Sequence, residues 1–191
     1  MVNGAAGQAG ALSRQERRHL LETAIRTIGD RTPTLAALGE TAGIAIEDLA
    51  RDAAQSGADA VLIMPPSDPA DFETARALAR FQRVFDATDL PVAFYQTRYA
   101  PETVTTLAAL PRVFAIKEGN GSPAVFERNL RSVRALGRGV AVWSTHSSWL
   151  LADLATGADG ILSGMGSVAA DLQASLARSE EHTSELQSPN T

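Results

Sequence analysis

The chain alternates between short apolar runs and amphipathic stretches, and this alternation restricts its fold more than any other feature. The apolar runs have the length of β-strands and lie at 34–38, 60–64, 91–95, 113–117, 140–143 and 160–163. The stretches between them carry apolar residues at helical spacing and lie at 14–28, 44–55, 71–86, 101–110, 123–136 and 148–155. Strands joined through one helix are expected to be parallel, because such a crossover returns the chain to the same end of the sheet.

One turn sequence occurs twice, as Gly-Ala-Asp-Ala at 57–60 and as Gly-Ala-Asp-Gly at 157–160. Each copy ends a predicted helix and begins the next strand, as expected of a repeated βα unit. Six strands, with the remnant of another at 1–3, favour most of a (β/α)8 barrel. A Rossmann sheet is disfavoured because no Gly-x-Gly-x-x-Gly motif follows a first strand. The sequence therefore predicts an α/β fold, an incomplete TIM barrel.

Composition excludes several classes of protein. With 191 residues, 45% hydrophobic and 20% charged, the chain is long enough for one sizeable core. A net charge of −5 argues against nucleic-acid or anionic-membrane partners, which need concentrated positive potential. No cysteine is present for a disulfide or a thiolate metal site. No leader-like or membrane-length apolar segment is visible, so we expect a cytoplasmic protein.

Lys117 is the only lysine in the chain, and every other permanently basic side chain is arginine. It ends the predicted strand 113–117. Lysine can lose its proton in a protein whereas arginine in practice cannot, so a lysine at the end of a buried strand suggests a nucleophilic amine. The alternative is a structural lysine that reaches solvent in a chain whose arginine content reflects a GC-rich genome.

Strand parity places a second polar group beside this lysine. Alternate residues of a barrel strand face the interior, so Lys117 is expected to share a face with Ala115 and Val113, opposite Phe114 and Ile116. Tyr95 is expected to share the inward face of the preceding strand with Ala93. Both functional groups would then lie at the carboxyl ends of adjacent strands, where barrel enzymes hold their catalytic residues.

Together these features resemble the family of dihydrodipicolinate synthase and N-acetylneuraminate lyase, the class I aldolases that use a Schiff base. The similarity runs from about residue 2 to residue 176. The matching segments are Val-Asn-Gly-Ala-Ala-Gly at 2–7 with Leu12, Ser13 and Glu16, the turns at 57–60 and 157–160, Asp-Leu-Pro-Val at 89–92 leading to Tyr95, and Ile-Lys-Glu-Gly at 116–119.

The resemblance implies that Lys117 forms a Schiff base with pyruvate or a related 2-oxo acid and that Tyr95 relays protons. The iminium would draw electrons from the neighbouring carbon, so that a carbon–carbon bond can form or break. A free lysine has a pKa of about 10.4. The site must therefore lower the pKa of Lys117, and burial can bring a lysine to about 7 to 8.

The sequence also departs from the family pattern. The loop that binds the substrate carboxylate commonly reads Gly-Thr-Thr-Gly-Glu in the family, and here Ala5 and Ala6 leave only backbone N–H groups for that role. The second tyrosine of the synthase relay falls near Ser67. Gln-Thr-Arg at 96–98 replaces Asn-x-Pro, so that Arg98 either meets a distal substrate carboxylate or is solvated. We therefore expect a divergent family member.

Two further segments lie at the predicted catalytic rim. Ser163 begins Ser-Gly-Met-Gly, whose backbone N–H groups suit an anionic substrate group, although small residues at a tight turn explain it equally well. His146 follows a strand and either contacts substrate or lies exposed in a helix-capping loop.

The sequence thus predicts a lyase or synthase that performs aldol cleavage or condensation on a small 2-oxo acid, with no metal ion and no organic cofactor. The alternatives are a sugar-acid dehydratase of the same family and a catalytically inactive barrel fragment. The resemblance further implies a homotetramer.

Both ends differ from the family. Residues 1–177 are expected to form a partial barrel that lacks the first βα unit and the C-terminal helices. Residues 178–191 resemble the translation of a common short-read sequencing adapter, so we predict that this tail is not native.

Overall fold

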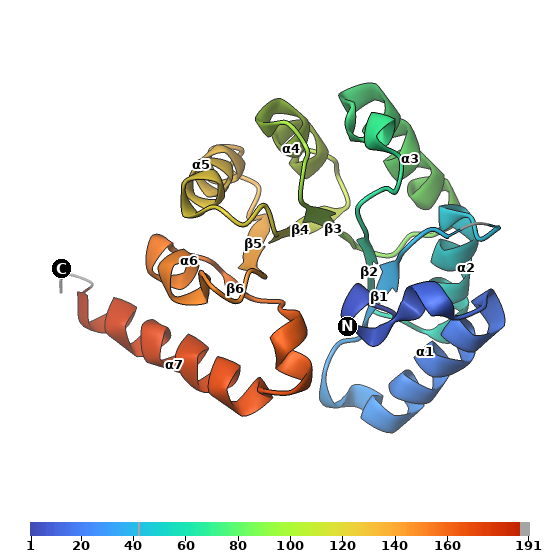
Figure 1. The fold of residues 1–191 in the computed structure, drawn as a ribbon, viewed down its shortest axis with the longest axis horizontal. Coiled ribbons are helices and arrows are strands. Elements are labelled where there is room, and N and C mark those ends of the chain that lie inside the picture. Colours follow the sequence, from blue (N-terminus) through green and yellow to red (C-terminus); the bar gives the residue numbers. More distant parts are fainter. Residues whose placement is uncertain (42, 188–191) are drawn as a thin grey trace.

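The computed structural model describes residues 1–41 and 43–187, in which six parallel strands form one curved sheet with helices along its outer face (Figure 1). The strands follow one another in chain order: β1 Leu35–Leu38, β2 Ala60–Ile63, β3 Val92–Gln96, β4 Val113–Glu118, β5 Ala141–Ser144 and β6 Gly160–Ile161. An incomplete TIM barrel is therefore confirmed. In the described part of the chain, no helix is long and apolar enough to cross a membrane.

Helices alternate with these strands, and the periodicity predicts all of them except the last, α7. They are α1 Arg14–Ile28, α2 Ile46–Ser56, α3 Thr74–Ala87, α4 Pro101–Ala108, α5 Pro123–Arg134, α6 Leu150–Thr156 and α7 Ala170–Gln187. Short 3-10 helices are η1 Ala5–Gly7, η2 Ala9–Ala11, η3 Gly29–Arg31, η4 Pro69–Phe72 and η5 Gly164–Ser167. The capping box expected of Ser13 and Glu16 begins α1, with both reciprocal hydrogen bonds present.

Buried side chains divide into two clusters on the two faces of the sheet. The larger cluster packs the strands against the helices and includes Val61, Phe94 and Ile116. The smaller cluster lines the interior of the arc and includes Ala93 and Ala115, with Tyr95, Trp143 and Leu162 packed against it. Small residues on the inner face leave room there for functional side chains.

The expected assignment of β4 side chains to the inner and outer faces of the sheet is correct from Ala115 onward but wrong before it. The register shifts between β3 and β4, since Val92 pairs with Val113 and Ala93 pairs with Ala115. This β-bulge inserts one residue into β4 and reverses the faces on its amino-terminal side. Val113 consequently packs in the outer cluster, and Phe114 packs against Trp143 with ring centroids 5.7 Å apart.

The repeated turn has the same hydrogen bonds in both copies. Asp59 donates its backbone N–H to the carbonyl of Thr34, and its carboxylate accepts from the Thr34 N–H at 2.6 Å. Asp159 makes both contacts with Val142, at 2.8 Å for the carboxylate. Gly57 and Gly157, the first residues of the two turns, have a positive φ, and each ends its helix in the left-handed conformation. Each turn thus clamps one strand to the start of its neighbour.

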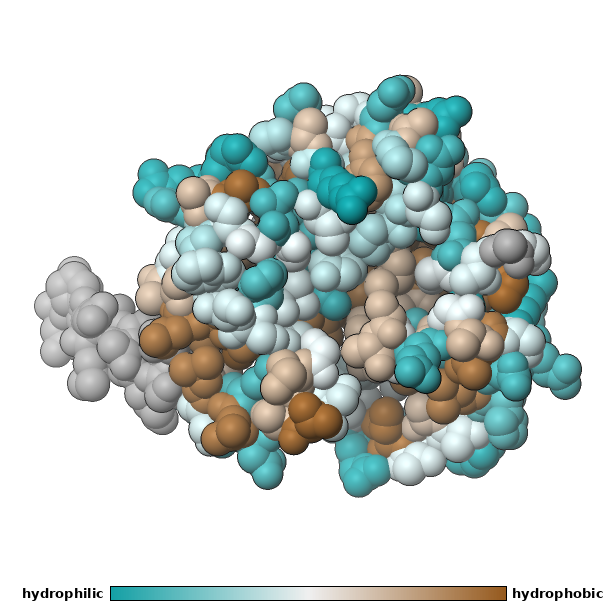
Figure 2. Space-filling model, in the orientation of Figure 1, coloured by the Kyte–Doolittle hydropathy of each residue, from teal (hydrophilic) through white to brown (hydrophobic). Residues whose placement is uncertain are grey.

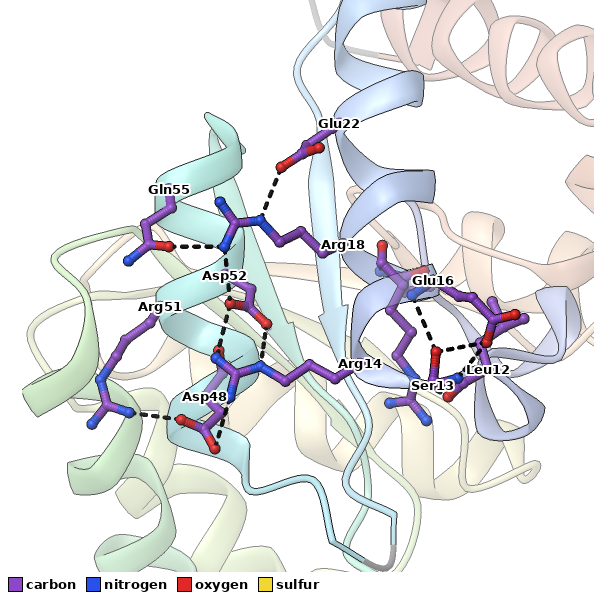
Figure 3. A network of polar contacts seen from close by, with 12 residues as sticks. Leu12, Ser13, Arg14, Glu16, Arg18, Glu22, Asp48, Arg51, Asp52 and Gln55 are labelled. Carbon is purple, nitrogen blue, oxygen red and sulfur yellow. Dashed lines mark hydrogen bonds and ion pairs between the residues drawn. The ribbon is translucent and has the colours of Figure 1, made fainter.

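A polar network joins α1 to α2 (Figure 3). The guanidinium of Arg14 donates two hydrogen bonds to the carboxylate of Asp52, at 2.6 and 2.9 Å. Arg18 lies 3.7 Å from the same carboxylate and also donates to Gln55. Because Asp52 is buried, these bonds fix the angle between the two helices.

The arc is open between its two ends. Val2 forms an isolated parallel bridge with Ala36, which is the predicted strand remnant, and the amino terminus faces η5 across the opening (Figure 1). Apolar side chains gather on the surface over α6 and α7 (Figure 2) and include the exposed Leu151, Val168 and Leu172. Helix α7 continues through the predicted tail boundary at 177/178, while 188–191 lie outside the described residues.

Candidate active site

Strand β4 carries Lys117 to the carboxyl end of the sheet, directly beside Tyr95 of β3. The two residues are register partners, so their side chains leave the sheet on the same inner face. The Lys117 side chain is buried, and its Nζ lies 4.2 Å from the centroid of the Tyr95 ring. The structure therefore brings together the amine and the phenol that the sequence predicted as neighbours.

Burial changes the acid–base behaviour of the amine. Removal from water disfavours the ammonium form and lowers the pKa of Lys117 from its usual value of 10.5 to about 8. At pH 7 about a tenth of the molecules would then carry a neutral amine, compared with roughly one in a few thousand for a free lysine. The site meets the first requirement for nucleophilic attack on a carbonyl carbon.

The phenol of Tyr95 is held in its protonated form. Burial is the main cause that raises the pKa of Tyr95, and the negative charge of Glu118 raises it further. A side-chain hydrogen bond with Thr145 acts in the opposite direction on that pKa. The Thr145 hydroxyl also donates to the carbonyl of Leu162 at 2.7 Å, so its single proton serves either this carbonyl or the Tyr95 oxygen.

Thr145 is a site residue that the sequence analysis missed. It follows β5 directly, at the same edge of the sheet as Lys117 and Tyr95. A hydroxyl residue directly after a predicted strand was the available signal in the sequence.

The backbone at Gly119 lies against the Tyr95 ring. A Cβ atom at this position would lie 2.4 Å from Cε2 and 2.9 Å from the hydroxyl oxygen of Tyr95. A methyl group would also approach Thr145 to 2.9 Å. Only glycine lets the Tyr95 ring and the Cγ2 methyl group of Thr145 approach the strand end this closely, because contacts under 3.0 Å force a shift.

A cavity of about 570 Å³ lies at the opening of the arc, lined by the loop that precedes α1 and by the segment after β6. Ala6 and Ser163 both line it, and a Cβ on Gly164 would lie 3.3 Å from that of Ala6. Met1 lines the cavity as well, and its amino group has a pKa lowered by burial and then by the charge of Lys117. Lys117 and Tyr95 themselves do not line the cavity.

Not every predicted binding residue reaches this cavity. Ala5 is exposed and does not line it, although its carbonyl accepts the N–H of Gln8. Arg98 is exposed and makes no hydrogen bond or ion pair with the described part of the chain. Ser67 and His146 are exposed too. Over the residues that the structure describes, no three His, Cys, Asp or Glu side chains gather as a metal site would need.

Fold and site together define a parallel α/β barrel with an amine and a phenol at the carboxyl ends of adjacent strands. The model of the dihydrodipicolinate synthetase family matches residues 1–187. The chain belongs to this family.

Two curated relatives show how far the similarity extends along the chain. The 4-hydroxy-tetrahydrodipicolinate synthase of Exiguobacterium sibiricum is 33% identical over 169 residues, which is 85% of this chain and 56% of the relative. That of Corynebacterium diphtheriae is 29% identical over 90% of this chain and 57% of the relative. The chain thus spans little more than half the length of these relatives.

Solved structures agree with the fold. The dihydrodipicolinate synthase of Oceanobacillus iheyensis superimposes with a TM-score of 0.85 at 23% identity, covering 96% of this chain and 61% of that one. A prophage protein of the dihydrodipicolinic acid synthase family from E. coli K12, solved in complex with pyruvate, gives a TM-score of 0.80 at 25% identity. This match covers 98% of the chain and 68% of the prophage protein.

Proposed function

We propose that this protein is a Schiff-base-forming lyase or synthase that performs aldol cleavage or condensation on pyruvate or a related 2-oxo acid. The observation that carries the proposal is the buried amine of Lys117, with its lowered pKa, 4.2 Å from the Tyr95 ring. Pyruvate bound to the E. coli prophage protein supports the substrate class. The chemistry uses an amine and a phenol of the chain and needs neither a metal ion nor an organic cofactor.

The covalent step begins with the neutral amine of Lys117, which attacks the ketone carbon of the 2-oxo acid and forms a carbinolamine. Tyr95 donates its proton to the departing hydroxyl, so that water leaves and an iminium forms. Loss of a proton from the adjacent carbon gives the enamine, which attacks an aldehyde or forms when an aldol bond breaks. The proton lost from this carbon returns to the Tyr95 phenolate, which a hydrogen bond from the Thr145 hydroxyl stabilises in the meantime.

The cavity at the opening of the arc supplies the binding surface in this proposal. Backbone N–H groups near Ala6 and Ser163 would hold the substrate carboxylate, and Ala5 would contribute its N–H from the rim. Arg98 is free to meet a second, distal carboxylate because no described group engages it. The whole protein would assemble as a homotetramer, and the exposed apolar residues on the surface over α6 and α7 support this.

A dehydratase that acts on sugar acids is the second candidate. The observation that favours it is the serine at 67, near the position of the second tyrosine of the synthase relay, so that the site lacks that second phenol. The same imine would then eliminate water from the neighbouring carbon atoms.

Reduction with borohydride in the presence of pyruvate tests the proposal. Because Lys117 is the only lysine, the chain has a single side-chain amine, and peptide mapping by mass spectrometry locates the adduct without ambiguity. We expect one reduced pyruvate on Lys117. The Met1 amino group is the internal control, since it is the other amine able to react.

Lys117→Arg is the matched variant and should carry no adduct. A folded, unmodified wild-type chain, or label on Met1 alone, would refute the proposed function. Turnover of deoxy sugar acids without any aldehyde product would select the dehydratase.

A further inference from the structure

Glu118 is a buried carboxyl group that the proposed chemistry does not use. It follows Lys117 directly on β4 and is only 3% exposed. Successive side chains of a strand point to opposite faces, so Glu118 leaves the sheet toward α5 while Lys117 points into the arc. An apolar residue could fill this position without the cost of burying a carboxyl group.

The two carboxylate oxygens of Glu118 bind two different segments. One oxygen accepts a hydrogen bond from Nδ2 of Asn129 on α5, at 2.7 Å, and Asn129 is buried as well. The other accepts from the backbone N–H of Asn120, at 2.9 Å. Together the two bonds tie the turn after β4 to the body of the barrel.

That turn determines where the Tyr95 ring lies. Gly119 donates its N–H to the carbonyl of Gln96 at 2.9 Å. Asn120 donates its side-chain amide to the carbonyl of Thr97 at 3.0 Å. The ring of Tyr95 rests on the bare Cα of Gly119, with no room for a Cβ between them. A shift of the turn would therefore move the phenol relative to the amine.

We propose that Glu118 is a positioning residue that acts through Asn120 and Gly119 to hold the Tyr95 phenol over the Lys117 amine. Its contribution to catalysis rests on the proposed function. Its contribution to geometry does not, because the contacts hold whatever the substrate is.

Three variants separate positioning from charge. Glu118→Ala removes both hydrogen bonds. Glu118→Gln keeps an oxygen for Asn120, and its new N–H can donate to Oδ1 of Asn129, which has no partner in the structure, once the Asn129 amide turns over. Asn120→Ala removes only the link to Thr97, and Asn120 is exposed, so this variant should fold like the wild type.

The first readout is the rate of borohydride trapping with pyruvate. Small misplacements at a reacting centre can cost about 100-fold in rate. We expect Glu118→Ala to slow trapping about 10-fold or more, Asn120→Ala a few-fold, and Glu118→Gln to restore most of the wild-type rate.

The second readout needs no substrate. Reductive methylation with ¹³C-formaldehyde labels the single lysine, and its methyl resonance should show a ring-current shift from Tyr95. Tyr95→Leu gives the reference position without the ring, and the labelled Met1 amine is the internal standard. We expect Glu118→Ala and Asn120→Ala to move the resonance toward the Tyr95→Leu position.

Folded variants that keep both the wild-type trapping rate and the wild-type resonance would overturn the proposal, as would Glu118→Gln behaving like Glu118→Ala. If Glu118→Ala does not fold, Asn120→Ala decides. If the wild type traps no pyruvate, the proposed function fails, but the methyl resonance still tests the position of the ring.

Discussion

The reactivity expected of the buried Lys117 depends on its neighbours, and on Tyr95 above all. The scarcity of lysine indicated Lys117, and strand parity predicted that Tyr95 lies beside it on the same face of the sheet. The sequence could not predict the ring contact at 4.2 Å or the part played by Gly119. Those depend on the path of the turn after β4, which side-chain periodicity does not encode.

Thr145→Val tests the proton relay. Valine has nearly the shape of threonine but no hydroxyl, so the Tyr95 phenol would lose its partner and its pKa would rise further. General acid–base groups contribute about 100- to 10,000-fold to rates, and a relay partner should contribute part of this. We expect pyruvate trapping on Lys117 to slow about 10-fold.

Thr106→Val is the matched control for that variant. Thr106 donates its hydroxyl to the Glu102 carbonyl on the exposed face of α4, away from the site. It should leave the trapping rate unchanged. An equal rate in folded Thr145→Val would remove Thr145 from the relay.

Among the elements, the type and order of the six strands and of α1 to α6 followed from apolar periodicity, with boundaries shifted by a few residues, whereas α7 was not predicted. The predicted helix at 71–86 begins at Thr74, since Pro69–Phe72 forms the 3-10 helix η4 instead. The bulge in β4 was not predictable, because a run of consecutive apolar residues has no alternation that could reveal an inserted residue. Phe114 was assigned to the wrong face for this reason.

Asp52→Ala tests the contact between α1 and α2. It removes the paired hydrogen bonds from Arg14 and leaves that guanidinium with its ion pair to Asp48 at 3.2 Å. Charge-assisted hydrogen bonds contribute about 1.5 to 3 kcal/mol, so we expect the free energy of unfolding in urea to fall by about 1 to 3 kcal/mol.

Arg51→Ala is the control, because it breaks only the exposed ion pair with Asp48. Its effect should stay within about 0.5 kcal/mol. Similar losses in both variants would mean that the buried carboxylate contributes no more than a surface ion pair.

For the barrel as a whole, two adjacent buried groups give opposite pH dependences of stability. The pKa of Glu118 is raised to about 7, chiefly by burial, so its stabilising contribution is full below about pH 4.5 and is lost as the pH rises through 7. The pKa of Lys117 is lowered to about 8, so the cost of its buried charge is full below pH 8 and disappears as the pH rises toward 10.5. The combined contribution of the two groups to the free energy of unfolding is therefore smallest between pH 7 and 8.

Lys117→Met isolates the lysine part of this dependence. A shift from 10.5 to about 8 corresponds to about 3 kcal/mol. The variant should therefore be more stable than the wild type at pH 7 by up to about 3 kcal/mol, in urea unfolding, and the gain should shrink between pH 8 and 10.5. A gain that does not change with pH would show that packing, and not charge, is its cause.

Direct titration of the lone lysine tests the amine hypothesis most simply. After ¹³C-methylation, the Lys117 resonance is followed by NMR from pH 6 to 12, with a denatured sample as the reference. We predict a midpoint near 8 in the folded protein and near 10.5 in the denatured one. A folded-state midpoint equal to the denatured value would show that the amine is solvated and protonated at neutral pH, which contradicts a nucleophilic lysine.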